Sequence, residues 1–248
     1  MKNIGIMGAG YIARAMAKTL RGMKERDGSV APYAIASRDA EKARAFASQE
    51  GFERAYGSYE ELAADPRVDL IYIATPHSHH LEQMRLCIEN GKAVLCEKAF
   101  TANARQAEEA LRLAAERRVP VTEAIWTRYM PSRRMIDELI ASGEIGEPKL
   151  LTANIGYDIA RKERILRPEL AGGALLDVGV YPLNFAGMVF GGDVARMEGS
   201  ASLMETGVDH TDHITLEYAD GRIAHLSATA LCRTNRHGVI YGTKGCIV

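Results

Sequence analysis

The first half of the chain alternates between short apolar runs and longer segments in which apolar residues recur at helical spacing. The run DLIYIAT at 69–75 is almost continuously apolar, which is typical of a central parallel strand covered on both faces. Strands are predicted over 2–7, 32–37, 69–75, 93–96 and 120–124. Helices are predicted over 11–22, 39–50, a short segment after Ser58, 79–90 and 103–117. Strands that alternate with helices predict an α/β fold with a doubly wound parallel sheet.

The pattern changes after Trp126. A helix is predicted over 132–142, and strand-like runs then follow at 149–157, 194–204, 213–218 and 222–230. Such runs favour a largely antiparallel sheet. We therefore predict two domains, a doubly wound domain over 1–125 and an α+β domain with a mostly antiparallel, open-faced sheet over 126–248.

A glycine-rich loop connects the first predicted strand to the first predicted helix. Its sequence, GAGYIA at 8–13, matches the dinucleotide-binding pattern G-x-G-x-x-[G/A] in the required strand-to-helix context. Gly8 permits the tight turn, Gly10 lets the backbone approach a pyrophosphate, and Ala13 lets the helix pack on the strand. The helix N-terminus adds free N–H groups and a positive dipole end. The loop predicts a Rossmann domain whose cofactor contacts Gly8, Gly10, Tyr11, Ile12 and Ala13.

The end of the second predicted strand bears on the choice between NAD and NADP. NAD-binding chains usually place an Asp or Glu there to hold the ribose 2′-hydroxyl. This chain has Ala36-Ser37-Arg38 instead, so no carboxylate stands there to repel a phosphate. Ser37 can donate a hydrogen bond, and Arg38 can bind a 2′-phosphate through charge-assisted bonds. We predict NADP rather than NAD, and Asp39 remains open as either a helix N-cap or a ribose ligand.

Composition excludes some classes of binding partner and bears on the cellular compartment. The formal net charge of −1 argues against nucleic acid or an anionic membrane as the main partner. No stretch approaches about 20 consecutive apolar residues, so no membrane-spanning helix is expected, and the N-terminus does not have the pattern of a signal peptide. None of the four cysteines forms a Cys-x-x-Cys pair. A reducing, cytoplasmic setting is expected.

Motifs along essentially the whole chain carry a resemblance to a known family. They are the glycine loop, ATPHSHH at 74–80, Glu97-Lys98, EAIWTRY at 123–129 and GGALLDVGVYP at 172–182. In this order they resemble the Gfo/Idh/MocA oxidoreductase family, and within it the dimeric dihydrodiol dehydrogenase and NADP-dependent D-xylose dehydrogenase branch. The resemblance implies hydride transfer between nicotinamide C4 and a carbinol or carbonyl carbon of a sugar, polyol or cyclic trans-diol. It also implies a homodimer.

Three positions distinguish this chain from the usual family pattern. Ala99 stands where the family has a proline after Glu-Lys, so the loop lacks a residue that would fix φ. Ala171 replaces the first of three glycines. Tyr181 stands where many relatives have a histidine, which resembles the dihydrodiol dehydrogenase branch.

The chemistry of the reaction indicates roles for three residues. Hydride transfer to a carbonyl leaves an alkoxide, so a proton donor must lie beside it. A lysine ammonium stabilises a tyrosine phenolate, so we predict Tyr181 as the general acid/base and Lys98 as the group that tunes it and holds the substrate oxygen. The reverse assignment stays open, because a desolvated lysine also transfers protons. Asp177 shares a face with Tyr181 if a helix begins there, and could bind substrate hydroxyls or orient Lys98.

Two groups of residues complete the predicted site. The cofactor is predicted to contact Thr75, Pro76, His80, Glu97 and Lys98, of which the first three are implied by the resemblance to contact its ribose and nicotinamide. The substrate is predicted to contact Trp126, Arg128, Asp177 and Tyr181. For Trp126 the alternative is packing in the core, and Arg128 is equally ambiguous.

Other interpretations compete with this one. The histidines of 77–80 and of DHTDH at 209–213 could suggest a metal, but the latter segment has the pattern of a strand and the former fits a cofactor mouth, so we expect none. The basic run at 161–167 is interpreted as a solvated loop or active-site rim. A non-catalytic NADP-binding sensor with the same fold is the alternative function. The chain ends inside a strand-like segment, 241–248, and the resemblance implies longer relatives, so we expect a truncated or partial form.

Overall fold

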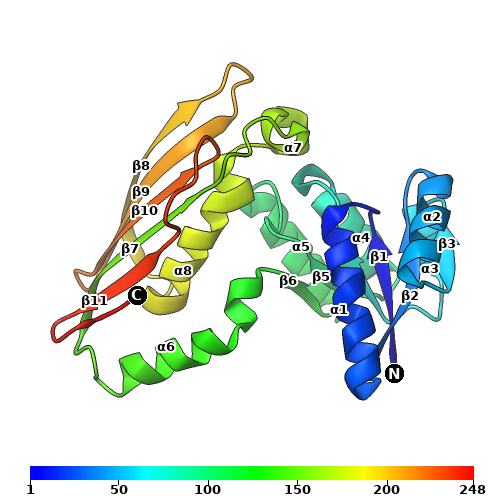
Figure 1. Ribbon diagram of the computed structural model, residues 1–248, viewed down its shortest axis with the longest axis horizontal. Coiled ribbons are helices and arrows are strands. Elements are labelled where there is room, and N and C mark those ends of the chain that lie inside the picture. Colours follow the sequence, from blue (N-terminus) through cyan, green and yellow to red (C-terminus); the bar gives the residue numbers. More distant parts are fainter. The chain divides into compact units, whose positions relative to one another are not determined.

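The computed structural model describes residues 1–248, which form two compact units, Met1–Ala124 and Ile125–Val248 (Figure 1). The sequence places the boundary after residue 125, beside this division. Each unit contains one six-stranded sheet with its own core. The two units are described separately below.

The first unit is a parallel sheet with helices on both faces. The strand order is β3-β2-β1-β4-β5-β6, and every neighbouring pair is parallel. The strands are β1 (Lys2–Met7), β2 (Val30–Ala36), β3 (Arg54–Tyr56), β4 (Leu70–Ile73), β5 (Ala93–Cys96) and β6 (Val121–Glu123). The helices are α1 (Tyr11–Asp27), α2 (Ala40–Glu50), α3 (Tyr59–Ala64), α4 (His80–Glu89) and α5 (Ala104–Arg117). The predicted doubly wound fold is confirmed, and the strand order reverses between β1 and β4, where such folds bind dinucleotides.

The central strands of this sheet are buried on both faces. In β4, Ile71 and Ile73 pack into the cluster beneath α4 and α5, whereas Tyr72 packs into the opposite cluster with residues of α1 and α2. This two-sided burial explains why 69–75 is apolar throughout rather than alternating. It also fixes the loops that follow β1 and β4 on a rigid support.

The second unit is a mixed sheet with helices on one face. The order is β12-β11-β7-β10-β9-β8, and only β7 and β10 pair in parallel. The strands are β7 (Pro148–Gly156), β8 (Val194–Leu203), β9 (Asp209–Tyr218), β10 (Ile223–Thr229), β11 (Gly238–Gly242) and β12 (Cys246–Ile247). The helices are α6 (Pro131–Ala141), the short α7 (Glu163–Leu166) and α8 (Val180–Phe190). The predicted mostly antiparallel sheet is confirmed, with one parallel pair.

The core of the second unit lies between its sheet and α6 and α8. Leu151, Leu216 and Ile240 are buried on the helix side of the sheet, in one cluster with Ala186 and Phe190 of α8. No helix of this unit covers the opposite face (Figure 1). The sheet is therefore open-faced within the unit, as the sequence predicts.

The helical stretch Pro168–Phe190 is long and apolar enough, by length and composition alone, to cross a membrane. The sequence does not predict such a span, because Asp177 and four glycines interrupt the apolar run. The continuous helix begins only at Ala174 and ends at Phe190, which is shorter than the about 20 residues that a span needs. It opens with a π-helical turn, Leu175–Gly179, and packs on the sheet as α8. Core helices of water-soluble proteins pass the same test.

Candidate functional site

The glycine loop of the first unit is built for close approach of a ligand to the backbone. Gly8 follows β1 with φ +98°, and a Cβ there would lie 2.8 Å from the Ala74 carbonyl oxygen, so a glycine is required. Gly10 is the N-cap residue of α1, and a Cβ there would meet no protein atom within 4 Å. No side chain caps this helix N-terminus. The open space beside Gly10 and the uncapped N–H groups fit the pyrophosphate of a dinucleotide.

The other residues of the hexapeptide separate into core and surface. Ala13 is fully buried and packs in the same cluster as Ile4 and Ile6 of β1, which is the close helix–strand contact that the small residue permits. Tyr11 is 88% exposed and Ile12 is partly exposed, both in the first turn of α1. Their side chains therefore border the loop, where the sequence places cofactor contacts.

The end of β2 presents a positive charge with no competing carboxylate. Asp39 is the N-cap of α2, and its carboxylate accepts the Lys42 N–H at 3.1 Å, so the N-cap interpretation holds. Ser37 is buried, and its Oγ accepts the Asp39 N–H at 3.3 Å. Arg38 is exposed and makes no ion pair. Burial, and then the charge of Arg38, lower the pKa of His79, which shows that this charge acts on the loop after β4.

His80, at the start of α4, connects the loop after β4 to the loop after β5. The His80 ring is fully buried, with Nδ1 at 2.8 Å from the Ala99 carbonyl and Nε2 at 3.0 Å from the Thr75 carbonyl. Burial lowers the pKa of His80, while the bonds to the Thr75 and Ala99 carbonyls act in the opposite direction. Thr75 donates its hydroxyl to Gln83 at 2.6 Å, and Pro76 is half-buried in extended backbone. His80 thus joins the backbone after β4 to the backbone after β5, and its ring has no exposed surface.

Glu97 and Lys98 follow β5, at the carboxyl edge of the parallel sheet. Glu97 accepts a bond from the Tyr72 hydroxyl, and its other oxygen accepts the Lys98 backbone N–H at 3.2 Å. Burial raises the pKa of Glu97, while the Tyr72 bond and the charge of Lys98 act in the opposite direction. Lys98 is half-buried, and the peptide bond that joins it to Ala99 is cis. Lys98 thus lies at the carboxyl edge of the sheet, where open α/β sheets bind ligands.

The helix from Ala174 to Phe190 carries Asp177 and Tyr181 in the second unit. Asp177 lies in the π-helical turn, a departure from regular helix that often marks functional sites. Its side chain is buried, and it accepts two bonds from Arg164, Nε to Oδ1 at 3.2 Å and Nη2 to Oδ2 at 2.9 Å. The sequence predicts a solvated loop or active-site rim for the run that contains Arg164, and only the fold shows that Arg164 pairs with Asp177.

Trp126 and Tyr181 are in direct contact. The indole Nε1–H donates to the Tyr181 hydroxyl oxygen at 3.1 Å, and the rings meet edge to face with centroids 6.2 Å apart. Trp126 is 56% exposed, so it is not a core residue. The donated bond orients the tyrosine hydroxyl and stabilises negative charge on its oxygen.

Arg128 is tied to the same helix one turn further on. Its Nε donates to Asn184 Oδ1 at 2.6 Å, and the Asn184 amide donates to Thr127 Oγ1 at 3.0 Å. These bonds fasten the 3₁₀ turn Trp126–Tyr129 to α8. Asn184 has no signal in the sequence, because neither its type nor its surroundings suggest a partner in another segment.

The partly buried Asp209 anchors the N-terminus of this helix, and the buried Asp212 lies beside it. Asp209 of β9 accepts the Leu175 N–H at 2.6 Å, and a Cβ on Gly173 would lie 2.1 Å from its other oxygen, so only glycine leaves room for it. Asp212 is 4% exposed beside it. Burial, and then the charge of Asp209, raise the pKa of Asp212 to about 7. Sequence reasoning considered this segment only for a metal, and no group of three or more potential ligands gathers to hold one.

Two family profiles together span nearly all of the chain. The profile described as an oxidoreductase family with an NAD-binding Rossmann fold matches residues 2–125, and that of the GFO/IDH/MocA C-terminal domain matches residues 134–248. Among curated proteins, trans-1,2-dihydrobenzene-1,2-diol dehydrogenase of Xenopus tropicalis is 39% identical over 244 residues, which are 98% of this chain and 73% of that protein.

Two solved structures resemble the whole chain. A 3-ketoreductase from Actinomadura kijaniata, in complex with NADP and TDP-benzene, is 27% identical with a TM-score of 0.85, covering 98% of this chain and 74% of that one. Levoglucosan dehydrogenase, in complex with NADH and L-sorbose, is 21% identical with a TM-score of 0.91, covering 100% of this chain and 72% of that one, and shows likeness of fold alone. The chain is an NAD(P)-dependent oxidoreductase that belongs to the Gfo/Idh/MocA family.

Proposed function

We propose that this protein is an NADP-dependent dehydrogenase acting on a vicinal diol, polyol or sugar, with Tyr181 as the proton-transfer residue. The observation that carries this proposal is the contact between the Trp126 N–H and the Tyr181 hydroxyl, on the same helix as buried Asp177. A relative of 39% identity is named for a cyclic trans-diol, which supports this substrate class.

In this proposal the cofactor and three residues of the chain have separate roles in the reaction. The cofactor, when bound at the glycine loop, supplies or accepts the hydride at nicotinamide C4. Tyr181 takes the proton from the substrate hydroxyl during oxidation and returns it during reduction, as a general acid/base does. Trp126 stabilises the negative charge that the tyrosine oxygen carries between these steps. Lys98 holds the substrate oxygen and favours its deprotonation by its positive charge.

Asp177 binds a second substrate hydroxyl in this proposal. Arg164 donates two bonds to it, and a carboxylate offers about four lone-pair positions, so it can accept a further hydrogen bond. A diol or sugar presents such a neighbouring hydroxyl, whereas a simple alcohol does not. The requirement for two adjacent hydroxyls follows from this arrangement.

The preference for NADP rests on Arg38. Its guanidinium has no carboxylate partner, and Asp39 faces the backbone of α2 instead. Arg38→Ala should weaken NADPH binding about tenfold or more and leave NADH binding nearly unchanged, since a hydrogen bond to a charged group contributes roughly 1.5–3 kcal/mol. Titration of cofactor fluorescence measures both affinities, with exposed Arg105→Ala as the matched control. Equal losses for the two cofactors would refute the 2′-phosphate assignment.

Turnover tests the proposed reaction itself. The purified protein with NADP⁺ should oxidise cyclic trans-diols or pyranose sugars, followed by nicotinamide absorbance. A protein that binds NADPH tightly and yet turns over none of these substrates would instead support a cofactor-binding sensor.

We also infer a homodimer formed through the open face of the second sheet, in a reducing cytoplasmic setting. On that face lie alternate strand residues such as Thr215, His225 and Tyr241, which no helix of this unit covers. All four cysteines are free, which supports the setting. Sedimentation should give a dimer, and Tyr241→Glu should convert it to a monomer.

A further inference from the structure

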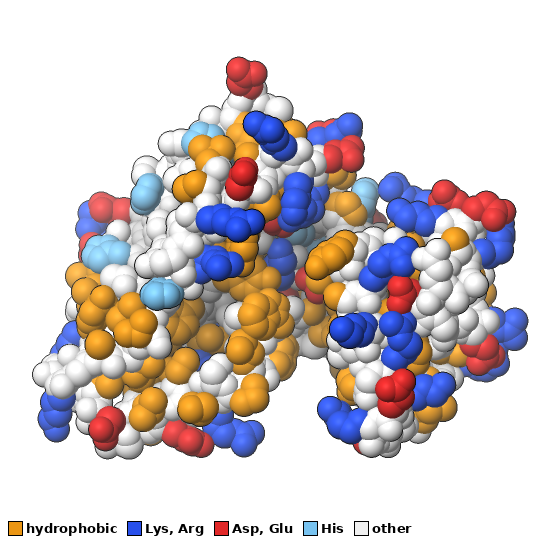
Figure 2. Space-filling view, in the orientation of Figure 1, with side chains coloured by type: hydrophobic (Ala, Val, Ile, Leu, Met, Phe, Trp, Pro, Cys, Tyr) orange, Lys and Arg blue, Asp and Glu red, His pale blue; other side chains and the backbone are white.

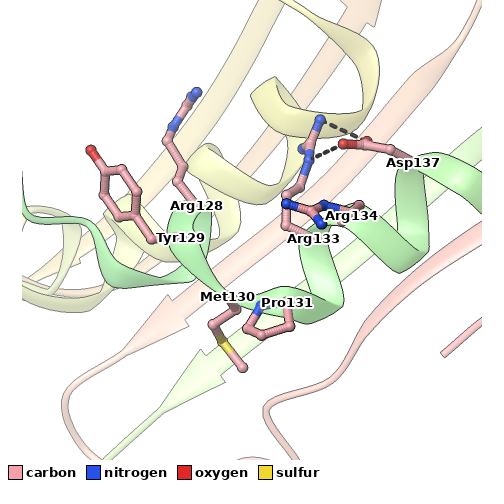
Figure 3. A pocket seen from close by; sticks show the side chains of 7 residues that line it. All are labelled: Arg128, Tyr129, Met130, Pro131, Arg133, Arg134 and Asp137. Carbon is pink, nitrogen blue, oxygen red and sulfur yellow. Dashed lines mark hydrogen bonds and ion pairs between the residues drawn. The ribbon is translucent and has the colours of Figure 1, made fainter. Parts of the chain in front are cut away.

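A groove of about 450 Å³ lies where the 3₁₀ turn Trp126–Tyr129 meets the start of α6 (Figure 3). It lies wholly within the second unit. Its lining is rich in arginine and contains one carboxylate: Arg128, Tyr129, Met130, Pro131, Arg133, Arg134 and Asp137. Arg128 and Arg133 extend in the same direction in Figure 3, with Arg134 beside them.

The charges of this groove do not cancel. Asp137 is engaged with Arg133 through two bonds of 2.8 Å, from Nε and from Nη2. Arg128 bonds to the neutral amide of Asn184, and Arg134 is exposed with no ion pair or hydrogen bond. Two guanidinium charges are therefore left without a counter-charge on one small surface.

Two further features favour an anion at this place. The Nη1 of Arg133 is buried and has no acceptor, and a buried donor without a partner is destabilising until an acceptor reaches it. Helix α6 begins with Pro131, has no side-chain cap, and carries no acidic residue in its first turn. The positive end of its dipole is thus uncompensated as well.

We propose that this groove is a binding site for an oxyanion, a carboxylate or phosphate group. The planar guanidinium fork matches both groups in two-point hydrogen bonding. Tyr129 and Met130, both exposed, supply an apolar wall for the carbon skeleton that carries the anion. The group belongs either to a free anion or to a substrate of the proposed dehydrogenase.

The geometry favours a substrate as the source of the anion, because the groove is hydrogen-bonded to the helix that carries Tyr181. The same 3₁₀ turn carries Trp126, which bonds to the Tyr181 hydroxyl, and Arg128, which bonds to Asn184 one turn further along α8. In that case the groove selects acidic or phosphorylated sugars, and this part of the inference rests on the proposed function.

The binding test needs no turnover. Inorganic phosphate is titrated into protein saturated with NADP⁺, so that the glycine loop is occupied, at ionic strength held constant with chloride. Fluorescence of Trp126, the only tryptophan, reports binding two residues from Arg128. We expect a saturable change that Arg134→Gln weakens about tenfold and Arg105→Gln, an exposed arginine of α5, leaves unaltered. No saturable change, or equal weakening in both variants, would overturn the proposal.

A second arm identifies the source of the anion. Glucose and glucose 6-phosphate are compared as substrates of the wild type and of Arg134→Gln, in buffer without phosphate. A fall in kcat/KM for the phosphorylated sugar alone assigns the groove to the substrate. Unchanged values for both sugars, together with phosphate binding in the first arm, assign it to a free anion. If neither sugar is turned over, the proposed function is affected while the binding arm still decides on the groove.

Discussion

The glycine loop of the first unit and the helix start of the second unit present polar groups by opposite means. Around Gly8 and Gly10 the backbone itself forms the surface, and no side chain caps the helix N-terminus. Around Tyr181 and Asp177 the polar atoms belong to side chains, each held by a partner from another segment, Trp126 or Arg164. Figure 2 shows basic side chains on several parts of the visible surface.

This difference predicts how each region responds to substitution. A backbone surface is disrupted by a single methyl group, because no side chain can move aside. A network of paired side chains responds in proportion to the bond that is removed, and its partners can compensate in part. The four predictions below test this contrast, from the largest effect to the smallest.

Tyr181→Phe should give the largest effect. Removal of the hydroxyl removes the proton-transfer group while the ring still packs against Trp126, so kcat should fall by roughly 10²–10⁴-fold with NADPH affinity unchanged. Steady-state kinetics and cofactor titration measure the two quantities. Tyr157→Phe, in the same unit, is the matched control and should retain activity. Near-normal turnover of Tyr181→Phe would show that the tyrosine is only a packing residue.

Gly10→Ala should weaken NADPH binding about 10- to 100-fold without loss of folding stability. The added methyl meets no protein atom within 4 Å, so the space it takes is that of the bound pyrophosphate, and such overpacking costs about 1–3 kcal/mol. Gly22→Ala, in the same helix and equally free of contacts, is the control and should bind NADPH normally. Equal affinities for the two variants would contradict the role of the loop.

Asp212→Asn should change how stability depends on pH. The pKa of Asp212 is raised from 3.8 to about 7, so between these values the folded state keeps a proton that the unfolded state has lost. The free energy of unfolding therefore falls as pH rises through this window, and the contribution is constant above it. Between about pH 5 and about pH 8, the wild type should lose on the order of 1–3 kcal/mol more than the variant.

Denaturant unfolding at the two pH values measures this loss. Exposed Asp193→Asn serves as the control, since it makes no hydrogen bond or ion pair, and its stability should follow that of the wild type. If Asp212→Asn also follows the wild type, the buried acid does not titrate in this range.

Trp126→Phe should give the smallest effect. The ring contact with Tyr181 is kept, and only the N–H donor is lost, which contributes about 0.5–1.5 kcal/mol. We expect kcat to fall about two- to tenfold, with substrate KM nearly unchanged. A loss as large as that of Tyr181→Phe would mean that the indole does more than donate this bond.

The first unit could be predicted from sequence because its signals are local. Residues 2–7 and 93–96 are predicted as strands and form β1 and β5 with those bounds. The strand β3 was missed, since its three residues at the sheet edge show no alternation. In the second unit, the parallel pairing of β7 with β10 was not foreseen, because periodicity identifies strands but not their partners.

The residues of the candidate site likewise fall into two groups, those that a local motif predicts and those that only the fold brings together. Gly8 and Gly10 are placed by a motif whose members are close in sequence, and Arg38 is placed by its position just after a predicted strand. The structure has all three in the loops after β1 and β2. Arg164 and Asp209 contact Asp177 and Leu175 from 13 and 34 positions away, respectively. Such pairings depend on how the chain folds back, and no single-sequence pattern encodes them.

The parallel pairing of β7 also bears on the order in which the chain becomes ordered. Leu150 of β7 pairs with Ile223 of β10 and with Tyr241 of β11, so both neighbours of this strand come from far later in the chain. In the first unit, by contrast, every neighbouring pair of strands except β1 and β4 is consecutive in the chain. Contacts of large sequence separation form slowly, and N-terminal domains fold first during synthesis. We therefore expect the nucleotide-binding unit to fold during synthesis before β7 has its two neighbouring strands, β10 and β11.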